Sequence, residues 1–153
     1  MGAIRPLLAA FTFALSGVLI GAGGYTFYYA RGASYLSDDP AACANCHIMR
    51  EQLASWQKSS HRSVATCNDC HTPHNLVGKY ATKIENGYRH SYAFTVQDWH
   101  EPIRMREASA RIVLHNCQDC HRQMVSQLPE HLVEPSEPVN CIACHRNAGH
   151  AGK

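Results

Sequence analysis

The chain begins with one long apolar segment. No charged residue occurs between Arg5 and Arg31, so residues 6–30 form an uninterrupted uncharged run. As a helix this run would be about 37 Å long at about 1.5 Å per residue, enough to cross a hydrocarbon core of about 30 Å. We therefore predict a transmembrane helix over residues 6–30, preceded by a short cytoplasmic N-terminus at residues 1–5.

A cleaved signal peptide is the competing interpretation of this segment, because the apolar run starts near Met1 behind a single arginine. The run is longer than the usual signal core of about 7 to 15 residues, and no clear small-x-small cleavage site precedes Arg31. A retained single-pass anchor is therefore the favoured interpretation.

Beyond the anchor, apolar residues recur at helical spacing in two stretches. Met49, Leu53 and Trp56 stand at i, i+4 and i+7, which predicts a short helix that ends near residue 59. Residues 75–92 predict a longer helix in which tyrosines are mixed with lysines and an arginine. That mixture suits a membrane surface, and an ordinary solvated face is the alternative.

Proline residues set the remaining boundaries. Because proline is favoured at the first position of a helix, Glu101-Pro102 predicts a third helix that runs to His115. Three further prolines predict an irregular loop over residues 129–140. The expected fold is mainly α: one transmembrane helix and a small helical domain over residues 31–153, with little regular sheet.

All cysteines of the chain belong to four copies of a Cys-x-x-Cys-His motif, the attachment signature of c-type haem. Two thiols at this spacing reach one haem edge, and the following histidine can bind the iron. A disulfide framework or zinc sites would not require a histidine after every second cysteine. We predict four covalently bound haem c groups, attached through Cys43, Cys46, Cys67, Cys70, Cys117, Cys120, Cys141 and Cys144.

Four haems leave little room for an ordinary apolar core in a domain of this length, so the porphyrins should form much of its interior. Covalent haem is assembled outside the cytoplasmic membrane, which places this domain on the periplasmic side. Equal spacing from Cys43 to Cys67 and from Cys117 to Cys141 suggests dihaem halves at about 31–100 and 101–153. The formal charge of +2 gives no argument for a nucleic-acid partner, because haem changes it.

The N-terminal anchor and the segments that follow it together carry a resemblance to a known family. Residues 34–40, followed by Cys43-Ala-Asn-Cys46-His47-Ile48-Met49, resemble the NapC/NirT family of membrane-anchored tetrahaem quinol dehydrogenases. Within that family, residues 56–61 and 90–95 look most like the small subunit of cytochrome c nitrite reductase.

The resemblance implies a short electron relay at the cytoplasmic (inner) membrane. Menaquinol would be oxidised near the first haem, and electrons would pass to a pentahaem catalytic partner that reduces nitrite to ammonium. The chain would not itself reduce nitrite. The same quinol oxidation feeding periplasmic nitrate reductase or another terminal reductase is one alternative, and a membrane haem sensor is an alternative of another class.

The resemblance also implies a set of axial ligands. Met49 would bind the first haem iron, with His47 released, although the residues alone favour His47. For the other haems the implied ligands are His71 and His150 on the second, His121 and His61 on the third, and His145 on the fourth. A lysine of the partner would complete the fourth.

A quinol site is predicted on the helix at 75–92. Lys83, Gly87 and His90 stand at i, i+4 and i+7 and so share one face. Quinol oxidation needs a hydrogen-bond partner and a proton acceptor, and histidine titrates in the useful range. Gly87 would let a flat ring approach the backbone. For His90, direct ligation of the first haem and proton acceptance both remain open.

Overall fold

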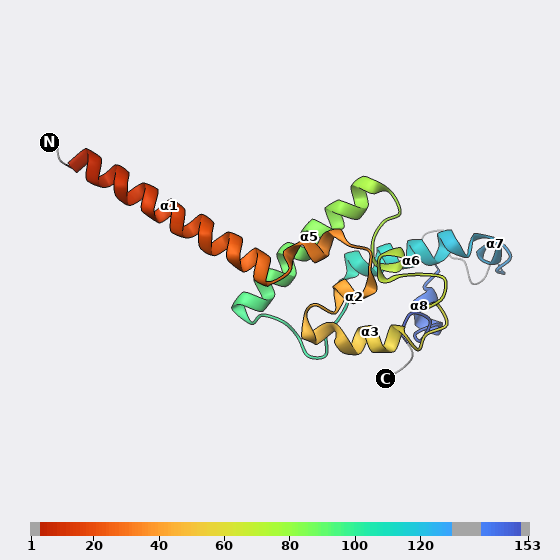
Figure 1. The fold of residues 1–153 in the computed structure, drawn as a ribbon. Helices are drawn as coiled ribbons and strands as arrows, with labels where there is room; N and C mark the ends of the chain where they lie inside the picture. Colours follow the sequence, from red (N-terminus) through yellow and green to blue (C-terminus); the bar gives the residue numbers. More distant parts are fainter. Residues whose placement is uncertain (1–3, 130–138, 151–153) are drawn as a thin grey trace. The chain divides into compact units, whose positions relative to one another are not determined.

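The computed structural model of the chain describes residues 4–129 and 139–150 (Figure 1). Contacts divide the chain into two compact units, residues 1–34 and residues 35–153. The 3-10 helix η1 (Gly32–Leu36) spans the boundary between these units.

The first unit consists mainly of the helix α1, which covers Ile4–Tyr29. Its bounds agree with the predicted 6–30 to within two residues, and none of its side chains is buried. The mean hydropathy of its most apolar window is 1.9, and the hydroxyl of Thr12 donates to the carbonyl of Leu8 at 2.8 Å. This hydrogen bond satisfies a polar group within the helix. By length and composition, α1 can cross a membrane.

The second unit consists of helices, one of 21 residues and the others shorter, and its described residues contain no strand. This confirms the mainly α fold. The elements are α2 (Pro40–Cys43), η2 (His47–Met49), α3 (Arg50–Trp56), α4 (Cys67–His71), α5 (Leu76–Val96), α6 (Glu107–Cys120), α7 (Arg122–Val125) and α8 (Cys141–Cys144).

Local capping explains why helices form at the cysteine motifs. The carboxylate of Asp39 accepts a hydrogen bond from the Ala41 amide at 2.9 Å and caps α2, and Pro40 takes the first helical position. Thr66 and Asp69 form a capping box at α4, and Asn140 caps α8. Three of the four motifs therefore begin or end in a helix that their own flanking residues stabilise.

The two longer helices differ in how well the pattern predicted them. α5 begins after the expected Asn75, whose side chain accepts from the Gly78 amide, and continues four residues past Tyr92. The prediction for the next helix was wrong at both ends, because α6 starts at Glu107 and extends through Cys120. Glu101-Pro102 instead lies in a bend with a cis peptide bond. A first-turn glutamate favours the observed start, since it lies near the positive end of the helix dipole.

The predicted loop at 129–140 lies largely outside the described residues. Its first residue, Pro129, and its last two, Val139 and Asn140, have no regular structure, whereas residues 130–138 are not described.

The interior of the second unit contains no fully buried apolar side chain among the described residues. The buried residues are all polar: Thr72, Lys83 and Asn116. The helices nevertheless have definite neighbours: α4 packs on α6, α2 lies against α3 and α4, and α8 lies against α6. A peptide without an apolar core agrees with an interior supplied by another group, as the four motifs predict.

Candidate functional site

Each cysteine motif lies close in space to the motif that follows it in the sequence. The thiols of Cys43 and Cys67 are in hydrogen-bonding contact. Burial raises the pKa of Cys70, and the neighbouring Cys117 adds to this effect. Burial also raises the pKa of Cys117, with a further contribution from Cys141. Each motif is therefore close enough to the next for their charges to interact, and all eight cysteines are free of disulfides.

Two pairs of histidine rings face each other across similar distances. The ring centres of His61 and His121 are 6.0 Å apart, and those of His71 and His150 are 6.2 Å apart. Each pair consists of the final histidine of a cysteine motif and a histidine from elsewhere in the chain. These are the two pairs that the resemblance implied.

The spacing of both pairs fits a metal between the rings. Two imidazoles bound to one metal from opposite sides, each with a nitrogen about 2 Å from it, have ring centres roughly 6 Å apart. A haem between such rings would also find two free thiols in the adjoining motif. The residues present therefore fit haem.

Backbone carbonyls fix the orientation of both distant histidines. The Nδ1–H of His61 donates to the Ala148 carbonyl at 2.9 Å, and that of His150 donates to the Gln52 carbonyl at 3.2 Å. Because Nδ1 carries the proton, Nε2 keeps its lone pair for a metal. Burial, followed by the nearby His150, lowers the pKa of His71, which favours the neutral form that binds iron.

The first and fourth motifs lack such a facing pair. Met49 and His47 both lie in η2, where Met49 is partly buried and His47 is exposed. His145 is exposed just after α8, and no other histidine ring of the described residues contacts it. The choice between Met49 and His47 therefore remains a prediction.

The predicted quinol residues meet one segment of the chain, residues 35–38. Lys83 is 6 % exposed, and its Nζ donates to the Ser37 carbonyl at 2.9 Å. The ring of Tyr35 lies beside Gly87, where an added Cβ would be 3.5 Å from it. The Tyr35 hydroxyl is 3.0 Å from the Nδ1 of His90. The structure thus brings the three residues to one face, and the flat ring at Gly87 belongs to Tyr35.

Asp38 is a member of this face that the sequence pattern did not reveal. Its carboxylate accepts hydrogen bonds from Lys79 at 2.5 Å, from Lys83 at 2.8 Å and from the Asn68 amide at 2.8 Å. The bonds from Lys79 and Lys83 lower the pKa of Asp38 to about 2. No spacing rule links residue 38 to α5. The one signal in the sequence is the pair Lys79 and Lys83 at i and i+4 on α5, because two neighbouring positive charges favour a nearby carboxylate.

Electrostatics place this face beside the first cysteine pair. Burial, with smaller contributions from Cys46 and Cys43, raises the pKa of Tyr35 to about 12, so its hydroxyl stays protonated. Desolvation and then the charge of Arg106 lower the pKa of His90, which keeps its imidazole neutral. A neutral imidazole and a buried ammonium therefore lie on one helix face, close to a candidate haem attachment.

The other histidines have less specific surroundings. His74 contacts the Asp69 carbonyl at 3.0 Å and the Asp119 carboxylate at 3.3 Å, so it bridges the second and third motifs. His131 lies outside the described residues.

Comparison with known proteins gives a uniform result. Residues 5–153 match the NapC/NirT cytochrome c family, N-terminal region. The chain is 37 % identical over 143 residues to the cytochrome c-type protein NrfH of Wolinella succinogenes, covering 87 % of this chain and 80 % of the relative. It is 31 % identical over 119 residues to the cytochrome c nitrite reductase subunit NrfH of Nitratidesulfovibrio vulgaris, covering 78 % and 71 %.

A solved structure resembles the chain over most of its length. It is the crystal structure of a cytochrome c nitrite reductase NrfHA complex bound to the inhibitor HQNO. The TM-score is 0.64 at 27 % identity, with 88 % of each chain covered.

Proposed function

Because the chain belongs to the NapC/NirT cytochrome c family, we propose that it is a membrane-anchored quinol dehydrogenase that delivers electrons to a cytochrome c nitrite reductase. The names of its relatives and of the complex that it resembles support this client over other terminal reductases. The observation that carries the quinol role is the α5 face, where a buried lysine and a neutral histidine adjoin the first cysteine pair.

The proposed cofactors are four haem c groups, one for each motif. Haem c supplies one-electron transfer at an iron held by thioether bonds and axial ligands. We assign His71 with His150 to the second haem and His121 with His61 to the third, an assignment that the ring spacings support. Met49 is assigned to the first haem by resemblance. His145 is assigned to the fourth, together with a lysine of the partner.

The substrate is proposed to be menaquinol, held by the α5 face. The ammonium of Lys83 has three protons, of which two are bonded to Ser37 and Asp38. The third can donate to a quinol oxygen. The Asp38 carboxylate offsets the positive charge of the nearly buried Lys83 ammonium.

His90 is assigned as the proton acceptor. If its Nδ1–H donates to the Tyr35 oxygen, Nε2 is unprotonated and can take the proton of a quinol hydroxyl. The same atom would be the one to ligate iron. A purified oxidised protein in which all four haems are low-spin and six-coordinate would favour ligation over proton transfer.

The two parts of the chain have different proposed roles. α1 anchors the protein in the cytoplasmic membrane, and the haem domain lies on the periplasmic side, where a pentahaem partner reduces nitrite to ammonium. An exposed His145 suits electron exit across a protein interface. The chain itself reduces no nitrite.

The proposal is tested on the complex purified from native membranes. A co-eluting multihaem nitrite reductase and reduction of the haems by a menaquinol analogue are expected. Lys83→Ala should slow this reduction at least about 10-fold, while dithionite still reduces every haem. Lys58→Ala, at an exposed lysine, is the matched control and should behave as wild type. A wild-type complex whose haems menaquinol cannot reduce would refute the quinol role.

A further inference from the structure

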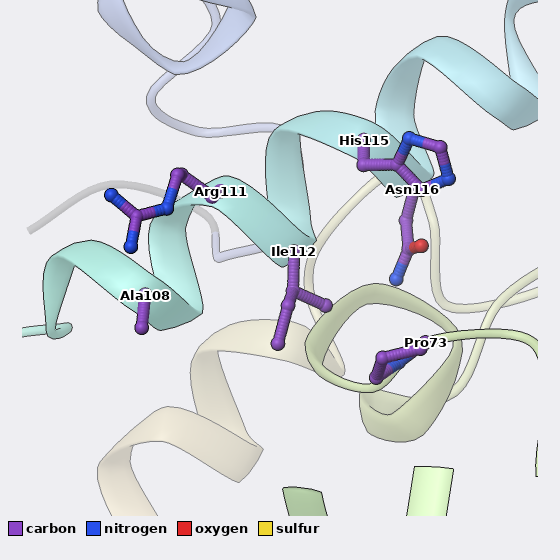
Figure 2. Close-up of a pocket in the computed structure, with 6 residues that line it drawn as sticks. All are labelled: Pro73, Ala108, Arg111, Ile112, His115 and Asn116. Carbon is purple, nitrogen blue, oxygen red and sulfur yellow. The ribbon is translucent and has the colours of Figure 1, made fainter. Parts of the chain in front are cut away.

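Asn116 is the most deeply buried of the described residues, with 3 % exposure. It lies in α6 directly before Cys117, the first cysteine of the third motif. Figure 2 shows its side chain pointing from α6 toward the segment of Pro73, with the amide nitrogen leading. It lines an open surface pocket of about 320 Å³ together with Pro73, Ala108, Arg111, Ile112 and His115.

The Asn116 amide binds the backbone on both sides of His71, a proposed haem ligand. Its Nδ2 donates to the Cys70 carbonyl at 3.0 Å and to the Thr72 carbonyl at 2.8 Å. These carbonyls belong to the residues immediately before and after His71. One rigid amide therefore fixes the backbone that carries His71, and with it the direction of the ring toward His150.

Neighbouring bonds strengthen this connection. The Thr72 hydroxyl donates to the Asn68 carbonyl at 2.8 Å, which holds Thr72 against the end of α4. His74 and Asp119 form a second bridge between the same two motifs. These bonds accompany the packing of α4 on α6.

We propose that Asn116 is a positioning residue through which the helix of the third haem sets the ligand geometry of the second. The proposal rests on the assignment of His71 and His150 to the second haem but not on the identity of the electron donor. Thr72 is buried, so loss of the amide would leave its carbonyl without this donor in a place that water does not readily reach. Bonds outside the ligand shell commonly change metal binding on the order of 10- to 100-fold.

Two variants separate the hydrogen bonds from the packing. Asn116→Asp keeps the shape but turns an acceptor toward the two carbonyl oxygens, and Asn116→Ala removes the side chain. Arg111→Ala, at a side chain of the same helix that is 66 % exposed and pairs with Glu107, is the matched control. The full-length protein is purified with its partner, and intact mass gives the number of attached haems.

The decisive measurement is the electron paramagnetic resonance spectrum with a redox titration of the oxidised protein. With four haems attached, both Asn116 variants should lose part of one low-spin bis-histidine signal and shift the potential of one haem, with a new high-spin signal. The control should match wild type. The proposal is overturned if Asn116→Asp carries four haems with unchanged spectra and potentials.

A folding defect would not obscure the result. If Asn116→Ala fails to accumulate, Asn116→Asp decides the outcome because it preserves the volume. Should Asn116→Asp also fail to retain four haems while His74→Ala retains them with wild-type spectra, Asn116 is a residue of folding only, and the positioning role is rejected. Menaquinol oxidation is measured separately, so failure of the quinol role does not alter this result.

Discussion

At the scale of single residues, the contact between Lys83 and Asp38 joins a buried charge to a half-exposed one. The side chain of Lys83 is 7 % exposed and that of Asp38 is 52 % exposed. A buried ammonium without a carboxylate is costly, and Asp38 supplies that carboxylate while remaining accessible to water itself. The proposed quinol contact would thereby be oriented by a residue that need not touch the quinol.

Asp38→Asn tests this dependence. The amide keeps the size of the side chain but removes the charge that compensates Lys83, so we expect the KM for a menaquinol analogue to rise about 10-fold with a smaller change in kcat. Asp39→Asn is the matched control, because asparagine caps a helix as well as aspartate does. An unchanged KM in Asp38→Asn would show that Lys83 does not depend on this partner.

His90 gives a prediction for the pH dependence of quinol oxidation. Its folded-state pKa lies below the usual value of about 6.5, so the imidazole is already neutral at pH 7. We expect kcat/KM to be flat above about pH 6.5 and to fall at lower pH as the base becomes protonated.

Replacement of His90 tests whether this residue causes the pH dependence of kcat/KM. His90→Asn should lower kcat/KM by about 100-fold and abolish the acidic decline, whereas His100→Asn should retain both the rate and the profile. If kcat/KM of the His90→Asn variant still fell below about pH 6.5 as in the wild type, the titrating group would be a residue other than His90.

At the scale of elements, α5 determines which residues can meet the segment 35–38. Its polar face contains Lys83 and His90, and between them Gly87 lies against Tyr35. The same helix also carries large exposed apolar side chains, among them Leu76, Val77, Ile84 and Tyr88. The helix therefore combines polar side chains that bind the segment 35–38 with apolar side chains that are left exposed.

Gly87→Ala tests whether this glycine is required for space. The new methyl would lie 3.5 Å from the Tyr35 ring, an ordinary contact, so quinol oxidation should remain near wild type. Alanine should stabilise the helix by about 0.5–1 kcal/mol, measured by thermal unfolding of the holoprotein. Gly87→Leu should displace Tyr35 and slow quinol oxidation. A large loss of activity in Gly87→Ala would indicate that the quinol itself approaches this position.

Sequence patterns predicted elements well where they are locally determined. Asn75 marks the start of α5 because its side chain caps the helix, a property of a few adjacent residues. Pro102 misled the prediction of α6, because proline is also common in bends and the real start depends on Glu107. The lysine and histidine of the α5 face follow from helical periodicity. Asp38 could not be predicted, since a contact across 45 residues leaves no periodic trace.

At the scale of the whole molecule, the described part of the haem domain has no apolar interior of its own. The buried side chains of the described residues are polar, and each takes part in hydrogen bonds. These bonds fix geometry, but their net stabilisation is small. The facing histidine pairs were expected only through resemblance, because no short-range pattern links His61 to His121 or His150 to His71.

Loss of haem attachment should therefore unfold the domain. When the full chain is expressed without cytochrome c maturation, we expect residues 35–153 to be cleaved rapidly by protease and to lose most helical signal in circular dichroism. The matured protein, treated in parallel, should resist cleavage. A protease-resistant domain without haem would contradict a haem-dependent interior.

The contact of His150 with the second motif has a consequence for biosynthesis. His71 is synthesised well before His150, yet their ring centres lie 6.2 Å apart. On the proposed assignment, the second haem lacks its distal histidine until residue 150 has been translocated. A chain truncated before His150 would thus leave this iron without one axial ligand, so His150 distinguishes a complete second haem site from an incomplete one.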